Sequence, residues 1–261
     1  MAARFLLGSI LLEPNRWSKE KTPTLRVSEW AARARDAGFD GIELWENHWA
    51  KADEAERAAL LASPCPVVYY NTYAPFDDAP RSRAARDAAA EATRRTRATG
   101  VKFNVGNAPA KQEEYLRAAE AWAGSLPAGC RALCECHPGT LLETPEAAAK
   151  AFSARWADPA RFGAIVHPFT QTPERLADWV RLLGERVVHA HVQIRTDKDA
   201  LVRLDRKPRE AEAALAALGD RRDRITYTLE FTEGTRTPDD KPDVLFKNAL
   251  ADLRFLRERV S

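Results

Sequence analysis

The sequence contains few cysteines, and their spacing does not match a redox or zinc motif. Four occur among 261 residues, and the closest two, Cys134 and Cys136, are separated by a single residue. This C-x-C spacing differs from the C-x-x-C of redox motifs and zinc knuckles, which argues against a redox function. We expect reduced thiols in a cytoplasmic protein, with Cys134 and Cys136 packed as small apolar side chains.

The chain also lacks a large excess of charge of either sign and a long hydrophobic segment. Forty basic residues against 38 acidic ones give a net charge of +2, too little to imply nucleic acid or a membrane surface as a partner. The apolar run from Phe5 to Leu12 is too short to span a bilayer, and no secretory cleavage site follows it. We therefore expect a small-molecule partner.

Short apolar runs typical of strands alternate with longer stretches, rich in alanine and arginine, that are typical of helices. Eight strands are predicted, at residues 4–12, 41–45, 67–71, 101–106, 131–137, 163–168, 187–194 and 225–231. Eight helices are predicted, at residues 27–37, 52–62, 81–98, 111–124, 145–155, 173–184, 208–218 and 242–259. Thr144-Pro145 and Thr172-Pro173 each place a hydroxyl cap before a first-turn proline. Eight strands that alternate with eight helices predict an α/β protein, a single (β/α)8 TIM barrel that forms one domain over residues 1–261.

Seven ionisable side chains fall inside or just after the apolar runs, where charged groups are seldom buried without a partner. They are Glu43, Glu135, His137, His167, His189, His191 and Glu230. Active sites of TIM barrels lie at the carboxyl ends of the strands, and the fifth to eighth predicted strands each bring a carboxylate or an imidazole there. Two carboxylates and two imidazoles would suit one divalent ion of the manganese, cobalt or zinc type.

Five stretches combine the predicted strands with polar residues at their ends: AGFDGIELWENH at 37–48, CECHPGTLLETPEAA at 134–148, GAIVHPF at 163–169, VVHAHVQ at 187–193 and TLEF at 228–231. In their order and spacing the chain resembles the xylose-isomerase-like TIM barrels, the sugar phosphate isomerase/epimerase superfamily that also contains the type IV apurinic endonucleases (AP endonuclease family 2). The resemblance covers nearly the whole chain. It implies one metal ion held by residues on strands five to eight, here Glu135, His167, His191 and Glu230. For the sugar epimerases it implies that the two metal-bound glutamates are the acid–base pair.

Two strands depart from the family pattern. The sixth often reads Asp-Pro-x-His, whereas HPFT here puts His167 in place of the acid and Thr170 where a substrate-contacting histidine would be. The seventh often reads His-x-Lys-Asp, and HVQI lacks both the lysine and the acid. An imidazole in place of a carboxylate makes the ligand set less negative, which favours manganese, cobalt or zinc over magnesium.

The chemistry of such a site can be stated without the family. A divalent ion that chelates a hydroxyl and a neighbouring carbonyl acidifies the C–H between them, because it stabilises the negative charge that develops. With Glu135 and Glu230 on opposite sides, one can remove a proton and the other return it, so we predict an isomerase or epimerase for a sugar or polyol. Expected contacts with the substrate near the mouth are Glu43, Trp45, His48, Tyr70, Lys102, Asn104, His137 and Arg195.

Other functions stay open. The same metal and base would also serve a lyase or dehydratase that expels a leaving group from an inositol, a keto-sugar or a glycoside. A catalytically inactive sugar-binding relative would be indicated by the absence of bound metal in the purified protein. A nuclease would require a trinuclear metal cluster and a DNA-binding surface, to which five histidines and a near-neutral charge are poorly suited.

Several residues also have a structural interpretation. Glu135 would lie on a loop if the strand boundary were misplaced, and His167 before a proline would cap a turn. His189 is expected to be a hydrogen-bonded neighbour or an orienting partner of His191 rather than a ligand, and His137 either an orienting partner of a ligand or a substrate contact. Trp30 and Trp179 suit either contacts in a homo-oligomer or the packing of helices on the barrel.

Overall fold

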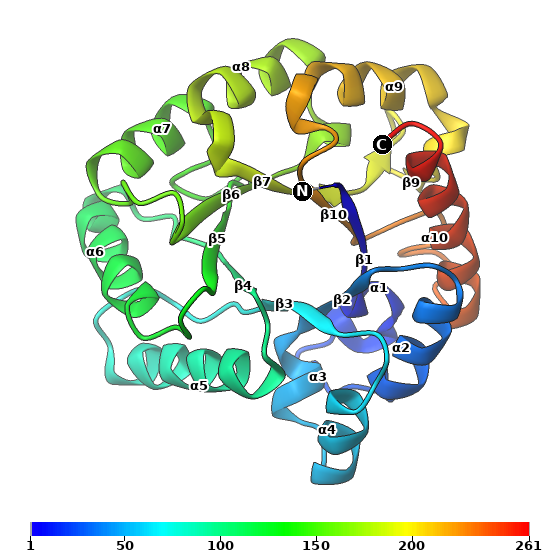
Figure 1. Cartoon of the computed structure of the whole chain (residues 1–261), viewed down its shortest axis with the longest axis horizontal. Helices are drawn as coiled ribbons and strands as arrows, with labels where there is room; N and C mark the ends of the chain where they lie inside the picture. The colour runs from blue at the N-terminus through cyan, green and yellow to red at the C-terminus, as the bar shows by residue number, and fades with distance from the viewer. Residues whose placement is uncertain (1, 261) are drawn as a thin grey trace.

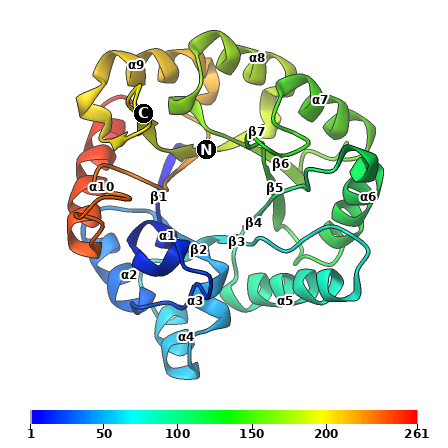
Figure 2. The same cartoon turned by 180° about the vertical axis from the view of Figure 1, so that it is seen from behind.

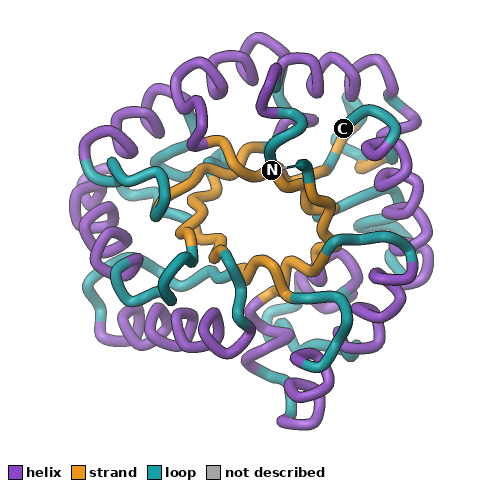
Figure 3. The backbone as a smooth tube through the Cα atoms, viewed as in Figure 1, coloured by secondary structure: helices purple, strands orange, loops and turns teal. Residues whose placement is uncertain are grey.

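Eight parallel strands form a closed barrel inside a ring of helices, which confirms the predicted (β/α)8 fold (Figures 1 and 3). The structure is a computed structural model that describes residues 2–260, so the predicted domain limits at 1 and 261 fall outside the described residues. Around the barrel the strands follow the order β1-β10-β7-β6-β5-β4-β3-β2. They are β1 (Arg4–Gly8), β2 (Gly41–Trp45), β3 (Val67–Asn71), β4 (Gly100–Phe103), β5 (Arg131–Glu135), β6 (Phe162–Val166), β7 (Val187–Val192) and β10 (Thr226–Leu229).

The helices cover the outside of the barrel and can be followed from both sides in Figures 1 and 2. They are α1 (Ser9–Leu12), α2 (Val27–Asp36), α3 (Glu46–Ala50), α4 (Glu54–Leu61), α5 (Pro80–Thr96), α6 (Gln112–Ala123), α7 (Pro145–Ala154), α8 (Pro173–Leu183), α9 (Pro208–Ala217) and α10 (Pro242–Arg257). The hydroxyls of Thr144 and Thr172 accept hydrogen bonds from the backbone N–H groups of Ala147 and Arg175 respectively, so both predicted caps are present. Within residues 2–260, no helix is both long and apolar enough to cross a membrane.

The first and seventh predicted strands are longer in the prediction than in the structure. Ser9–Leu12 form helix α1 with all four side chains buried, because a short apolar run suits a buried helix as well as a buried strand. The seventh strand ends at Val192, and the chain then forms a small antiparallel hairpin of β8 (Ile194–Arg195) and β9 (Leu201–Val202). This hairpin turns Arg195 toward the mouth of the barrel, where it lines a cavity.

Apolar side chains form two cores. The larger lies between the strands and the helices. In it Trp30 packs edge-on against Phe246 with ring centroids 5.4 Å apart, and Trp179 is buried, so both tryptophans pack helices on the barrel.

The smaller core fills the barrel toward the amino ends of its strands, and we call it the apolar layer. It consists of Leu6, Val68, Tyr69, Leu133 and Ile165. Gly100 leaves room for it, because a Cβ there would lie 2.8 Å from the Tyr69 ring and 3.0 Å from Leu133. The inward residues that follow at the carboxyl ends are mostly polar, so the barrel interior changes from apolar to ionisable along its axis.

Candidate functional site

Four ionisable side chains from four neighbouring strands meet at the carboxyl end of the barrel. Glu135 ends β5, His167 follows β6, His191 lies in β7 and Glu230 follows β10. Each is at most 4% exposed, and one ligand atom from each lies within 4.8 Å of the others. We call these four residues the acid–imidazole cluster. Glu135 therefore lies on a strand and not on a loop, and its side chain points into the barrel, as the alternation of side chains along the strand predicts.

The contacts within the cluster are short. Oε1 of Glu135 lies 3.0 Å from Nε2 of His167 and 2.9 Å from Nδ1 of His191. The same Nδ1 lies 3.5 Å from Oε2 of Glu230. Carboxylate oxygen and imidazole nitrogen are ligands that manganese, cobalt and zinc accept, so the donor set fits a single divalent ion of this kind.

The electrostatics of the cluster favour positive charge at its centre. Burial works to lower the pKa of His191, but the charges of Glu230 and Glu43 and a hydrogen bond to Glu135 hold that pKa well above its usual value. Burial likewise works to raise the pKa of Glu135, yet Lys102 and the two histidines keep it well below its usual value. The carboxylate of Glu135 is therefore ionised across the physiological range and is able to bind a cation.

Glu43 lies beneath the acid–imidazole cluster and does not line the cavity, contrary to its expected contact with substrate. Its carboxylate accepts hydrogen bonds from Thr228 Oγ1 at 2.7 Å and from Asn71 Nδ2 at 3.1 Å. It also lies 3.1 Å from Nε2 of both His189 and His191. Because Nδ1 of His191 faces the cluster while Nε2 faces Glu43, Glu43 is placed to fix the orientation of that ring, as carboxylates commonly do for histidine ligands.

Glu43, His189 and His191 also form a second group of side chains close enough to hold a cation. His189 makes a further contact of its Nδ1 with Thr226 Oγ1 at 2.5 Å, and its ring packs edge-on against that of His191. Within residues 2–260, no hydrogen bond joins His189 directly to His191. The two rings share the Glu43 carboxylate, which agrees with a role of His189 as an orienting partner of His191.

Glu135 is held on its other side by two residues of the fourth strand and its end. Nζ of Lys102 lies 2.7 Å from Oε2 of Glu135, and the ammonium is 4.0 Å from the centre of the Tyr73 ring. Burial works to lower the pKa of Lys102, but Glu135, Tyr73 and Glu230 raise it. Asn104 Nδ2 donates to the same carboxylate oxygen at 2.8 Å, while its buried Oδ1 has no hydrogen-bond partner within residues 2–260.

Gln193 connects three parts of the site, and the sequence analysis did not propose it. Its amide nitrogen lies 3.1 Å from Nδ1 of His167 and donates to Oε2 of Glu230 at 3.2 Å. Its amide oxygen accepts from Nη2 of Arg195 at 3.3 Å. Its position two residues after His191 could have identified Gln193 in the sequence, because residues two apart in a strand lie on the same face.

A cavity of about 640 Å³ opens above the cluster, a volume within the usual range for small-molecule sites. Of the expected contact residues, Asn104, His137 and Arg195 line it, and Lys102 lies directly behind Glu135. The lining residues that sequence reasoning did not propose as contacts are Ile10, Trp17, Tyr73, Pro138, Thr170, Gln193, Phe231 and Arg236.

Three other expected contacts lie away from the cavity. Trp45 precedes α3, and its ring packs edge-on against His48 with centroids 5.2 Å apart. His48 is buried and lies 2.9 Å from Ser9 Oγ and 3.2 Å from Glu13 Oε2. Tyr70 packs in the core between strands and helices, because the neighbouring Tyr69 takes the inward position on β3. These three side chains therefore support the wall of the barrel.

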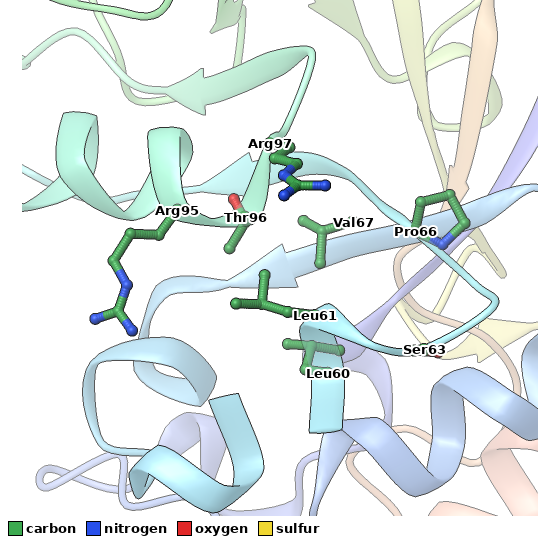
Figure 4. Close-up of a pocket in the computed structure, with 8 residues that line it drawn as sticks. All are labelled: Leu60, Leu61, Ser63, Pro66, Val67, Arg95, Thr96 and Arg97. Atoms are coloured by element: carbon green, nitrogen blue, oxygen red, sulfur yellow. The ribbon is translucent and has the colours of Figure 1, made fainter. Parts of the chain in front are cut away.

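A second hollow, of about 250 Å³, lies at the amino-terminal ends of β3 and β4 (Figure 4). Its lining combines apolar residues of α4 with Arg95 and Arg97, and the carboxylates and imidazoles of the acid–imidazole cluster are not among its lining residues. The chemistry of the chain is therefore concentrated at the opposite, carboxyl-terminal face, where TIM barrels have their active sites. The four cysteines are free thiols and buried, and burial raises the pKa of Cys65 to about 11.

No family model matches the sequence, and no curated protein matches it. Several solved structures match the fold. The structure described as the probable 3-DHS dehydratase AsbF from Bacillus anthracis has 16% identity and a TM-score of 0.67, over 98% of this chain and 99% of that one. A xylose isomerase domain protein from Alicyclobacillus acidocaldarius has 16% identity and a TM-score of 0.65, over 98% and 100% of the two chains. The 3-keto-D-glucoside 4-epimerase YcjR from E. coli has 13% identity and a TM-score of 0.61, over 95% and 99%.

Identities this low establish a shared fold and leave the reaction open. Endonuclease IV from Thermus thermophilus is similar as well, so the fold accommodates unlike chemistries. The closed eight-stranded barrel and the near-complete coverage agree with the resemblance found in the sequence motifs. The chain has the fold of the xylose isomerase-like TIM barrels.

Proposed function

We propose that this chain is a divalent-metal-dependent isomerase or epimerase that moves a proton at a carbon next to a carbonyl of a sugar or polyol. The observation that carries the proposal is the acid–imidazole cluster, with two carboxylates and two imidazoles buried at the floor of a cavity of substrate size. The names of fold neighbours, an epimerase among them, lend support.

Glu135, His167, His191 and Glu230 would hold the metal ion, which when bound polarises the substrate carbonyl and acidifies the neighbouring C–H. The protein's own groups do the rest. Glu43 and Gln193 orient the two imidazoles, and Lys102 fixes one oxygen of Glu135. The unpartnered Oδ1 of Asn104 supplies a hydrogen-bond acceptor for a substrate hydroxyl.

The two carboxylates differ in how strongly their neighbours hold them. Glu135 contacts Lys102, Asn104, His167 and His191, whereas the hydrogen bond of Glu230 comes from Gln193, with His191 at 3.5 Å. The less encumbered Glu230 is the better candidate to accept the proton from carbon. In an isomerase or epimerase Glu135 would be the second member of the acid–base pair, with Lys102 beside it as a hydrogen-bond donor.

The difference between the contacts of Glu135 and those of Glu230 also favours a second candidate function, a lyase or dehydratase. Elimination needs one base to remove the proton and a group that assists departure of the hydroxyl, rather than two interchangeable bases. The freer Glu230 suits the single base of such a reaction, whereas an ionised Glu135 held by Lys102 has no proton to return to carbon. Epimerisation conserves the mass of the substrate whereas elimination lowers it, so mass spectrometry of the product separates the two.

The test is proton exchange in D₂O with manganese-loaded protein and a panel of keto-sugars and inositols. We expect deuterium at the carbon next to the carbonyl, and a loss of turnover of roughly 10²- to 10⁴-fold in Glu230→Gln, the range typical of general acid–base catalysis. Glu174→Gln on the outer helix α8 is the matched control and should behave as wild type. Metal content is measured in the same samples. Turnover without exchange, together with full activity in metal-replete Glu230→Gln, would refute the assignment.

A further inference from the structure

We propose that the mouth of the cavity contains a subsite for one anionic group of the substrate, a carboxylate or a phosphate, formed by Arg195 and Arg236. The inference rests on the proposed function and specifies its substrate class. Arg195 lies in the hairpin after β7, and Arg236 lies in the loop after β10. Both line the same cavity as Glu135 and Glu230, so a ligand on the floor is within the same enclosure as the two guanidinium groups.

Arg236 presents its guanidinium beside an exposed aromatic ring. The group lies 4.2 Å from the centre of the Trp17 ring, and Trp17 in turn packs against Phe231 with centroids 5.5 Å apart. The backbone N–H of Arg236 donates to Asp240 Oδ2 at 2.8 Å, and among residues 2–260 the side chain of Arg236 forms no ion pair. Stacking of this kind holds the guanidinium plane while its N–H groups stay free to bind an anion.

Arg195 is held in place by two neighbours and keeps further donors. Its Nη1 donates to Asp199 Oδ1 at 2.9 Å and its Nη2 to Gln193 Oε1 at 3.3 Å. The side chain of Asp199 is 78% exposed, so water screens its charge and it neutralises Arg195 weakly. Because Gln193 also donates to Glu230, a group bound by Arg195 lies at a fixed relation to the proposed base.

The charge balance of the cavity indicates the sign of the missing partner. In the lining, the carboxylates of Glu135 and Glu230 balance the two arginines, and Lys102 adds a positive charge next to Glu135. With the carboxylates of Glu43 beneath the cluster and Asp199 beside Arg195 also counted, a divalent ion in the acid–imidazole cluster would leave the enclosure with a net positive charge. A concave site with such an excess of one sign attracts and orients a ligand of the other sign. A substrate that carries an anionic group satisfies this balance. A neutral sugar leaves the Arg236 guanidinium without an acidic partner among residues 2–260, and leaves Arg195 with the exposed carboxylate of Asp199 alone.

The test measures binding to manganese-loaded protein by titration calorimetry with 5-keto-D-gluconate, D-fructose 6-phosphate and D-fructose. At least one anion should bind about 10-fold or more tightly than D-fructose, in line with charge-assisted hydrogen bonds. Arg195→Gln and Arg236→Gln should each remove about 10-fold of anion affinity and lower the affinity for D-fructose by a smaller factor. Asp199→Asn frees Arg195 and should strengthen anion binding. Arg209→Gln, at an exposed position on α9, is the matched control. The tighter of the two anions identifies the group as carboxylate or phosphate.

Anion affinities equal to or below that of D-fructose, or arginine variants that bind both anions like wild type, would overturn the subsite. The D₂O exchange assay on the same samples keeps this result separate from the proposed function. Exchange without a preference for anions removes the subsite and retains the function. A preference for anions that depends on both arginines, without exchange in any ligand, retains the subsite and removes the function.

Discussion

Loss of the Lys102 ammonium should destabilise the metal-free protein far more than the metal-loaded protein. Lys102 is 1% exposed, and its Nζ lies 2.7 Å from Oε2 of Glu135, so Lys102→Met leaves a buried carboxylate without this cation. Removing one member of a buried ion pair costs about 3–5 kcal/mol. Each kcal/mol lowers Tm by about 2–4 °C in a chain of this size, so a fall of at least about 6 °C is expected. A divalent ion bound by Glu135 supplies another positive partner, so the fall should be smaller.

The assay is thermal unfolding followed by circular dichroism, in EDTA and in excess manganese. Lys150→Met on the exposed face of α7 is the matched control and should leave Tm unchanged in both conditions. The double variant Lys102→Met/Glu135→Gln removes both charges and should melt above the single variant in EDTA, because no buried charge is left unpaired. A loss of less than about 1 kcal/mol in EDTA, as for an exposed pair, or an equal loss in both conditions would refute the reasoning.

His191 and Gln193 give further expected outcomes. Elemental analysis should find that His191→Ala loses most of its bound manganese while His189→Ala retains it, and a wild-type manganese content in His191→Ala would remove His191 from the ligands. The pKa of His191 is raised above its usual 6.5, so its stabilising contribution is complete below that pH and is lost as pH rises through the folded value. Tm of the metal-free protein should therefore fall as the pH is raised above 6.5, and a fall of the same size in His191→Gln would contradict this. Gln193→Leu should weaken metal binding or activity by about 10- to 100-fold, and wild-type values would exclude its positioning role.

The alternation of apolar runs and helical stretches predicted the barrel, and polar residues at the ends of four successive runs indicated a site there. The choice of Glu135, His167, His191 and Glu230 as one set came from the family resemblance. Charged residues at the ends of apolar runs have few structural reasons to be there, and strand alternation fixes the side of the sheet on which Glu135 and His191 lie. The parallel order of the strands then brings the ends of β5, β6, β7 and β10 together. The alternation of side chains along a strand and the presence of charged residues in apolar runs thus indicate which residues far apart in the chain lie close together.

The cavity mouth was less predictable because loops form it. Trp17, Tyr73 and Arg236 come from three segments whose conformations depend on tertiary contacts, such as the stacking of Arg236 on Trp17. The position of Tyr70 away from the cavity has a different cause. Tyr69 and Tyr70 are equally plausible inward residues in the run VVYYN, and the choice depends on the barrel register, which no local pattern contains.

The apolar layer determines the route by which ligands enter and leave the barrel. Leu6, Tyr69, Leu133 and Ile165 lie below the acid–imidazole cluster and are at most 9% exposed, so the barrel is blocked at its amino-terminal end. A substrate enters, and its product leaves, through the same opening past Trp17 and Arg236. Where a reaction yields two fragments, the one nearer the opening must depart first. The carbon skeleton on the cavity floor is then the last species to dissociate, and it competes directly with the next substrate molecule.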